Sequence, residues 1–201
     1  MRRAAGPSAP RPLAVWVWPL ALCGLMALLA AAGDAPRLAL RYDRAALADG
    51  QWWRLLTAHA VHLGWAHALL NMAGVGLCAV LAPALFRTRS LAVLLLLLAL
   101  GVSGLLWLGS PQVSNYAGFS GVLYGLFVAG LWPQRRDPLA LLALAVVAGW
   151  MLWQWLGRPL AAEEQMIGGH IVSAAHVYGV AVAAAWLAAR AVWPHRVSAG
   201  S

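Results

Sequence analysis

Charged residues are confined to a few short segments of this chain, and that spacing restricts its fold more than any other feature. Only 10% of the 201 residues are charged, whereas 63% are hydrophobic. Most of the charge-poor stretches reach the roughly 18–20 residues that a helix needs to cross about 30 Å of hydrocarbon. There are six of them, at residues 13–33, 63–86, 91–109, 118–132, 138–157 and 171–193. The chain is therefore predicted to be an all-α polytopic membrane protein with six transmembrane helices, which excludes a soluble enzyme.

The net charge of +8 gives this six-helix plan an orientation. With the N-terminus placed inside, the inner segments hold nine arginines and one acid, whereas the outer segments hold five arginines and five acids. Positive residues gather on the cytoplasmic side of membrane proteins. We therefore predict a domain at 13–193 between cytoplasmic tails at 1–12 and 194–201. No basic run is long enough to follow a phosphate backbone, which excludes nucleic acid as a partner.

The N-terminal stretch imitates a secretory signal peptide, because two arginines precede an apolar run that ends in small residues at 30–33. This run is longer than the roughly 7–15 apolar residues of a signal peptide. Trp16 and Trp18 also lie near its cytoplasmic end, where interfacial aromatic residues belong. We predict an uncleaved first helix.

The fourth stretch, 118–132, is too short to cross the bilayer, since 15 residues give about 22 Å of helix. Trp132 and Pro133 fix its inner end, so the missing length lies on the outer side, where Ser120 is found. Small residues in the stretch let neighbouring backbones approach closely; they are Gly118, Gly121, Gly125, Ala129 and Gly130. We predict a glycine-rich fourth helix, shielded by the other five and preceded by irregular backbone that lines a wet cavity.

Polar residues at membrane depth are functional candidates. All six carboxylates lie in loops, which excludes an aspartyl intramembrane protease, and the absence of His-Glu-x-x-His removes the usual zinc-protease helix. The polar residues taken to lie at depth are His59, His62, His67, Asn71, Ser103, Ser120, Tyr124, Ser173 and His176.

Three predicted helices each have polar residues, or a polar residue and a glycine, on one face. The second, expected to continue to Leu85, carries His67 and Asn71 four residues apart. Ser120 and Tyr124 have the same spacing, and Gly179 follows His176 by three. If these faces converge, Ser120 gains a base in His176, while His67 and Asn71 supply donors where an oxyanion would form. Such a Ser-His dyad needs neither cofactor nor metal, and its histidine would be oriented by packing, under the ring of Tyr124.

Four motifs in this order resemble the rhomboid intramembrane serine proteases. They are Trp53-Arg54, the His62-x4-His67-x3-Asn71 of the second helix, Gly118-Phe119-Ser120-Gly121 followed by Tyr124, and Ala175-His176-x-x-Gly179. The resemblance implies that Ser120 is the nucleophile and His176 the general base. It also implies an oxyanion hole formed by His67, Asn71 and the Ser120 N–H, with Tyr124 stacked on His176. The supporting residues would be Gly118, Gly121, Gly179 and His62, the last as a bridge from loop backbone to the site or as an interfacial residue.

Within that family, the small size and the stretch from Trp53 to Trp65 look like the rhombosortase branch. This likeness implies a multi-pass protein of the bacterial inner membrane, with its active site open to the periplasm. Its transmembrane protein substrate would be a surface protein with a C-terminal glycine-rich motif, a hydrophobic helix and a basic tail. Hydrolysis and transfer to an amine both remain open. The family also implies that helix 138–157 acts as a gate, in which Trp150, Trp153 and Trp155 would control substrate entry.

Other interpretations of the same residues are available. Ser103 lies in a second Gly-x-Ser-Gly but has no tyrosine four residues later. His59, His62 and His67 could bind zinc or copper, although their spacing turns His67 away from the other two. The alternatives to a protease are therefore a catalytically silent, client-binding rhomboid-like protein and a histidine-based metal-handling membrane protein.

Overall fold

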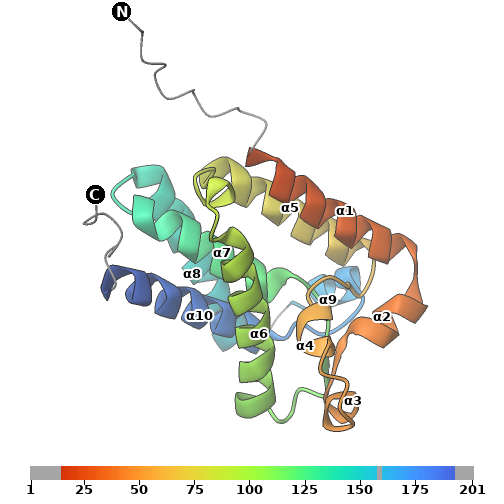
Figure 1. The fold of residues 1–201 in the computed structure, drawn as a ribbon. Coiled ribbons are helices and arrows are strands. Elements are labelled where there is room, and N and C mark those ends of the chain that lie inside the picture. The colour runs from red at the N-terminus through yellow and green to blue at the C-terminus, as the bar shows by residue number, and fades with distance from the viewer. Residues whose placement is uncertain (1–14, 158–159, 193–201) are drawn as a thin grey trace, which may run out of the picture.

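The computed structural model describes residues 15–157 and 160–192. The tails predicted at 1–12 and 194–201 lie outside the described residues. The helices of 12 or more residues pack together as the body of the molecule (Figure 1), and each lies within one of the charge-poor stretches. They are α1 (Val17–Ala31), α5 (Trp65–Leu81), α6 (Leu91–Gly109), α7 (Ser120–Leu131), α8 (Pro138–Gly157) and α10 (Ser173–Val192).

Three of these helices, α6, α8 and α10, are long and apolar enough to cross a membrane. A fourth span results among the described residues if α1 is counted together with α2 (Asp34–Leu40), which bends away from it by 115°. The chain is thus a mostly helical, multi-pass membrane protein. The six-span count remains a prediction, because α5 has 17 residues and α7 only 12.

Helix α5 ends earlier than expected. It was predicted to continue to Leu85, but it stops at Leu81, and a separate 3-10 turn, η2 (Leu85–Arg87), follows. The cause is Pro83, since a proline disfavours helical backbone at the residue before it. Ala82 accordingly leaves the helix with φ −131° and ψ 56°.

The connection from α1 to α5 contains a short strand that was not expected. After α2 come β1 (Tyr42–Asp43), α3 (Arg44–Ala48) and α4 (Arg54–Thr57). Strand β1 pairs antiparallel with β2 (Asn115–Tyr116), which places Tyr42 opposite Tyr116. The connection is therefore tied to the segment that leads into α7.

Two arginines hold this connection in place through backbone carbonyl groups. The guanidinium of Arg54 is buried and donates to the carbonyl oxygens of Leu38 and Arg41 at 2.9 and 2.8 Å. The guanidinium of Arg44 donates to four carbonyl groups at and beyond the end of α6, including that of Leu106 at 2.7 Å. The last carbonyl groups of a helix lack helical partners, so a cation there is stabilising.

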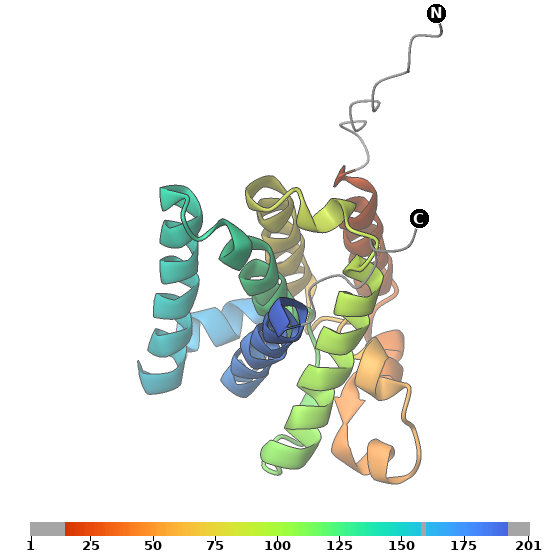
Figure 2. The same ribbon diagram turned by 60° about the vertical axis from the view of Figure 1, so that its left-hand side comes forward.

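Helix α7 is the centre of the molecule, because it contacts α5, α6, α8 and α10. Eight of its 12 residues are buried. Helix α8 stands at one edge of the molecule, on the left in Figure 2, with α9 (Ala161–Ile167) crossing near its end. The short helix α7 is thus surrounded by the longer helices α5, α6, α8 and α10.

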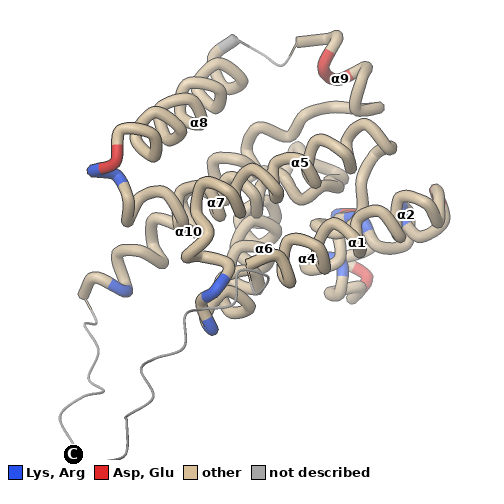
Figure 3. The backbone as a smooth tube through the Cα atoms, turned by 90° about the horizontal axis from the view of Figure 1, so that it is seen from above, with Lys and Arg blue, Asp and Glu red and all other residues tan. Residues whose placement is uncertain are grey.

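Charged residues are placed at helix ends and in the connection between α1 and α5, and the middles of the long helices carry none (Figure 3). Asp137 and two arginines precede α8, and Arg190 lies in the last turn of α10. This distribution leaves uncharged helix surfaces for the bilayer.

Candidate active site

The site is organised around the start of α7. Gly118 has φ +132°, a backbone conformation that L side chains rarely adopt. Its N–H donates to the carbonyl oxygen of Ala58 at 3.0 Å, and its own carbonyl accepts from the Tyr116 hydroxyl at 2.7 Å. The chain is thereby held in position just before Ser120, the first residue of α7. The first amides of a helix have no helical acceptor, so the Ser120 N–H is available to a ligand.

Ser120 and His176 form a hydrogen-bonded pair across 56 residues of sequence. The Oγ of Ser120 lies 2.9 Å from Nε2 of His176 on α10. The ring of Tyr124, one turn beyond Ser120, stacks on the imidazole with a centroid separation of 4.4 Å and an angle of 14°. His176 is buried, whereas Ser120 is partly exposed. A nucleophile and a base in this contact suit acyl transfer.

Close packing of α7 against α10 makes this pair possible. A side chain on Gly179 would clash with the carbonyl of Gly121, and one on Gly125 would meet the carbonyl oxygen of Gly179 at 2.8 Å. Glycine at these three positions therefore lets the two backbones touch.

His67 and Asn71 project from α5 toward the same cavity. Nδ1 of His67 accepts a hydrogen bond from the Leu63 N–H at 3.4 Å, which places the ring proton on Nε2. A Cβ on Gly118 would lie 2.8 Å from that Nε2. The Asn71 amide donates one hydrogen to the His67 carbonyl at 2.9 Å and keeps a second. Both side chains can therefore donate into the cavity.

This cavity has a volume of about 720 Å³, and it brings together all four polar residues expected to act in the chemistry. Ser120, His176, His67 and Asn71 line it together with Tyr124. Charged residues of both signs also line it, among them Arg37, Arg41 and Glu163.

His62 is buried beside His67. Its ring stands edge-on to that of His67, with a centroid separation of 5.0 Å and an angle of 84°. Its two ring nitrogens have no hydrogen-bond partner of good geometry among the described residues, and its bridging role remains a prediction. Burial and the adjacent His67 lower the pKa of His62 to about 3, which keeps it neutral.

His59 and Ser103 form a separate pair away from this cavity. Nε2 of His59 lies 2.9 Å from both the Ala99 carbonyl oxygen and the Ser103 hydroxyl on α6. Burial lowers the pKa of His59 to about 4, so the ring is neutral. Ser103 is fully buried and does not line the cavity. The serine of the second Gly-x-Ser-Gly instead bonds α6 to the loop that carries His59. Within the described ranges no group of three or more His, Cys, Asp or Glu side chains is arranged to hold a metal.

The sequence interpretation missed one residue of the site. Gln154 of α8 places Oε1 2.9 Å from Nδ1 of His176, so the histidine is held by a hydrogen bond as well as by Tyr124. The expectation of orientation by packing was therefore incomplete. The available signal was a lone amide within the apolar stretch 138–157, which was not counted among the polar residues at depth.

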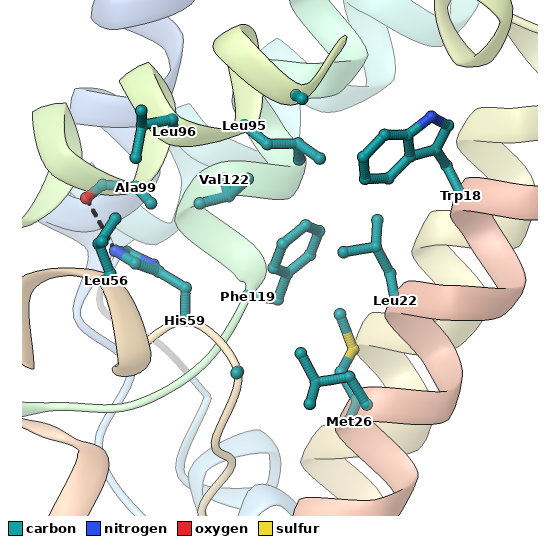
Figure 4. Close-up of a pocket in the computed structure, with 13 residues that line it drawn as sticks. Trp18, Leu22, Met26, Leu56, His59, Leu95, Leu96, Ala99, Phe119 and Val122 are labelled. Atoms are coloured by element: carbon teal, nitrogen blue, oxygen red, sulfur yellow. Dashed lines mark hydrogen bonds between the residues drawn. The ribbon is translucent and has the colours of Figure 1, made fainter. Parts of the chain in front are cut away.

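A second, apolar cavity of about 290 Å³ lies between α1 and α6 (Figure 4). Trp18, Leu22 and Met26 line one side, and Leu95 and Leu96 line another. The ring of His59 reaches its edge but bonds to Ala99 there. This cavity offers no nucleophile.

Comparison with known proteins agrees with these features. The sequence model of the Rhomboid domain matches residues 49–191, more than two thirds of the chain. The chain is also 37% identical over 84 residues to the protein named "Putative rhomboid protease YdcA" of Bacillus subtilis (strain 168). That match covers 40% of this chain and 41% of the relative, so it spans about two fifths of the curated protein.

Proposed function

The chain belongs to the rhomboid family, and on that premise we propose that it is an intramembrane serine endopeptidase that uses a Ser120–His176 dyad. The observation that carries this proposal is the 2.9 Å contact between Ser120 Oγ and His176 Nε2, with Tyr124 stacked on the imidazole. Acyl transfer by this route uses a nucleophile and a base that share a cavity, and the placement of Ser120 and His176 in one cavity supports the proposal.

In the acylation step, His176 Nε2 takes the Ser120 proton while Oγ attacks the scissile carbonyl carbon. Negative charge then develops on the carbonyl oxygen. Three donors would stabilise it: the Ser120 N–H, the Nε2–H of His67 and the second amide hydrogen of Asn71. As the C–N bond breaks, the imidazolium returns its proton to the leaving amine, and the acyl group remains on Ser120 as an ester.

In the deacylation step, His176 takes a proton from water as the water oxygen attacks the ester carbonyl carbon. The imidazolium then returns that proton to Ser120 Oγ as the ester bond breaks, which releases the acid product and free Ser120. Water would reach the ester past the exposed polar residues that line the cavity, among them Gln112, Ser114 and Asn115. If an amine attacks in place of water, the product is a new amide, which is the transfer reaction of a sorting enzyme.

The proposed topology has six spans within residues 13–193. The ends of α5, α7 and α10 and the starts of α6 and α8 lie near arginines, among them Arg87, Arg135 and Arg190. The positive-inside rule assigns that side to the cytoplasm, so both termini would be cytoplasmic and the cavity would open to the periplasm of a bacterial inner membrane. Helix α7, only about 18 Å long, would begin below the outer surface.

The proposed substrate is a single-span membrane protein cleaved near its outer end. Leu70 of α5 and Trp150 of α8 line the same cavity from two different helices, and a substrate segment could unwind between them. A glycine-rich segment suits such entry, because glycine weakens a helix. The resemblance of 53–65 to the rhombosortase branch favours surface proteins in which that segment precedes an apolar helix and a basic tail.

The test uses the full chain in liposomes and a synthetic single-span peptide. The peptide ends in a glycine-rich segment, an apolar helix and a basic tail, and its cleavage is measured. Wild type should cleave it and react with a fluorophosphonate probe. Ser120→Ala and His176→Ala should each abolish cleavage and leave the melting temperature unchanged. Full activity in Ser120→Ala would contradict the mechanism.

The same experiment separates the two rival functions. A silent client-binding protein would retain the peptide without cleaving it or reacting with the probe. A metal-handling protein would respond to chelators and not to Ser120→Ala.

A further inference from the structure

Helix α8 is apolar on its exposed surface and polar at one buried point. Gln154 is its only amide side chain and is 4% exposed, whereas Leu152 and Trp155 beside it are 58% and 60% exposed. An amide facing lipid without partners is unfavourable. The helix therefore turns its single amide inward, toward α10 and α9.

Two hydrogen bonds link Gln154 to its surroundings. Its Oε1 lies 2.9 Å from Nδ1 of His176, and its Nε2 donates to Oε1 of Glu163 on α9 at 3.5 Å. Glu163, Gln154, His176 and Ser120 thus form one line of polar contacts that ends at the nucleophile.

One arrangement of protons satisfies every contact in this line. A carboxylate only accepts hydrogen bonds, so the NH₂ of Gln154 faces Glu163 and its oxygen faces His176. An amide oxygen also only accepts, so Nδ1 of His176 must carry the ring proton. Nε2 then holds a lone pair, and the Ser120 hydroxyl donates to it.

We propose that Gln154 is a positioning residue, whose amide oxygen holds His176 in the tautomer and orientation that accept the Ser120 proton. This inference rests on the proposed function. In a Ser-His-Asp triad a buried carboxylate has the same task. Here a neutral amide performs it from α8, without placing a charge inside the membrane.

Two variants separate the hydrogen bond from the volume of the side chain. Gln154→Met keeps a similar length and removes the acceptor. Gln154→Glu combined with Glu163→Gln restores an acceptor toward His176 and exchanges the charge with its partner, which avoids two adjacent carboxylates. Leu152→Met, on the exposed surface of α8, is the matched control.

The readout is the reaction of the full chain in detergent with a fluorophosphonate, which does not require the natural substrate. We expect Gln154→Met to lower the maximal labelling rate at least about tenfold, with the half-saturating probe concentration nearly unchanged. The double variant Gln154→Glu/Glu163→Gln should recover most of the labelling rate, and Leu152→Met should label at the wild-type rate. A wild-type labelling rate in Gln154→Met would overturn the inference. So would a double variant that has the melting temperature of wild type but labels as slowly as Gln154→Met.

A second measurement keeps the inference testable if Gln154→Met does not fold. Two-bond ¹H–¹⁵N spectra of histidine-labelled wild type, with His176→Ala for assignment, report which ring nitrogen carries the proton. A protonated Nδ1 on His176 is expected, and a protonated Nε2 would overturn the inference. Failure of the proposed function looks different, because Ser120→Ala would then react with the probe as wild type does.

Discussion

At the scale of the residue, His67 uses its two ring nitrogens for different tasks. Nδ1 accepts from the backbone of Leu63, and Nε2–H is left to face the cavity beside Gly118. The i, i+4 spacing of His67 and Asn71 predicted a shared face, and both side chains line the cavity. The role of that face as an oxyanion hole remains a prediction.

His67→Phe tests this role, because it keeps an aromatic ring and removes the donor. We expect kcat for the synthetic peptide to fall by about 10²–10³, with the melting temperature little changed. His67→Gln, which offers an amide donor, should lose less. Equal kcat in His67→Phe and wild type would remove His67 from the oxyanion hole.

The spacing of residues could not predict Gln154. Periodicity identifies an amphipathic helix by its apolar stripe, but α8 is apolar all round, so no stripe indicates its buried face. The partner of Gln154 also lies 22 residues away on another helix. The one indication of Gln154 in the sequence was the unfavourable free energy of an unpaired amide in lipid, which requires a buried partner.

At the scale of the element, the contact between α7 and α10 sets the geometry of the dyad. Gly179→Ala places a methyl group against the carbonyl of Gly121, so we expect a loss of about 1–3 kcal/mol in the free energy of unfolding. Peptide cleavage should fall as well, because the helices that carry Ser120 and His176 are forced apart.

Gly76→Ala is the matched control for this prediction. Gly76 also lies within a helix, but a Cβ there has no neighbour within 4 Å. Alanine should therefore stabilise α5 by about 0.5–1 kcal/mol and leave cleavage unchanged. Similar melting temperatures for the two variants would show that the contact at Gly179 tolerates a side chain.

The positions of the long helices could be predicted from the sequence, because apolar runs without charges are a local signal. The connection between α1 and α5 could not. Its strand β1 has two residues, too few for alternation, and it forms because β2 lies beside it. Pro83 explains the early end of α5 and could be seen in the sequence. The prediction followed the hydropathy of the run instead and placed the end at Leu85.

At the scale of the whole molecule, two neutral histidines make stability depend on pH. Burial lowers the pKa of His59 to about 4 and that of His62 to about 3, from the usual 6.5. Their contribution to stability is present above pH 6.5. It is lost as pH falls toward 4, since the unfolded chain takes up protons that the folded chain resists.

The melting temperature in detergent should therefore fall between pH 6.5 and 4.5. His62→Phe removes one of the two groups, so the slope of unfolding free energy against pH should become shallower by up to about 1.4 kcal/mol per pH unit. Identical slopes for this variant and wild type would mean that His62 is not the group that titrates.

The sequence separation of 56 positions from Ser120 to His176 also bears on how the chain is made. During synthesis α7 enters the membrane before α8 and α10 exist, so its serine has no base. Under the proposed function, a partly inserted chain is inert toward the membrane proteins around it. Reactivity begins only when α10 docks through Gly179, which makes insertion of that helix the activating event.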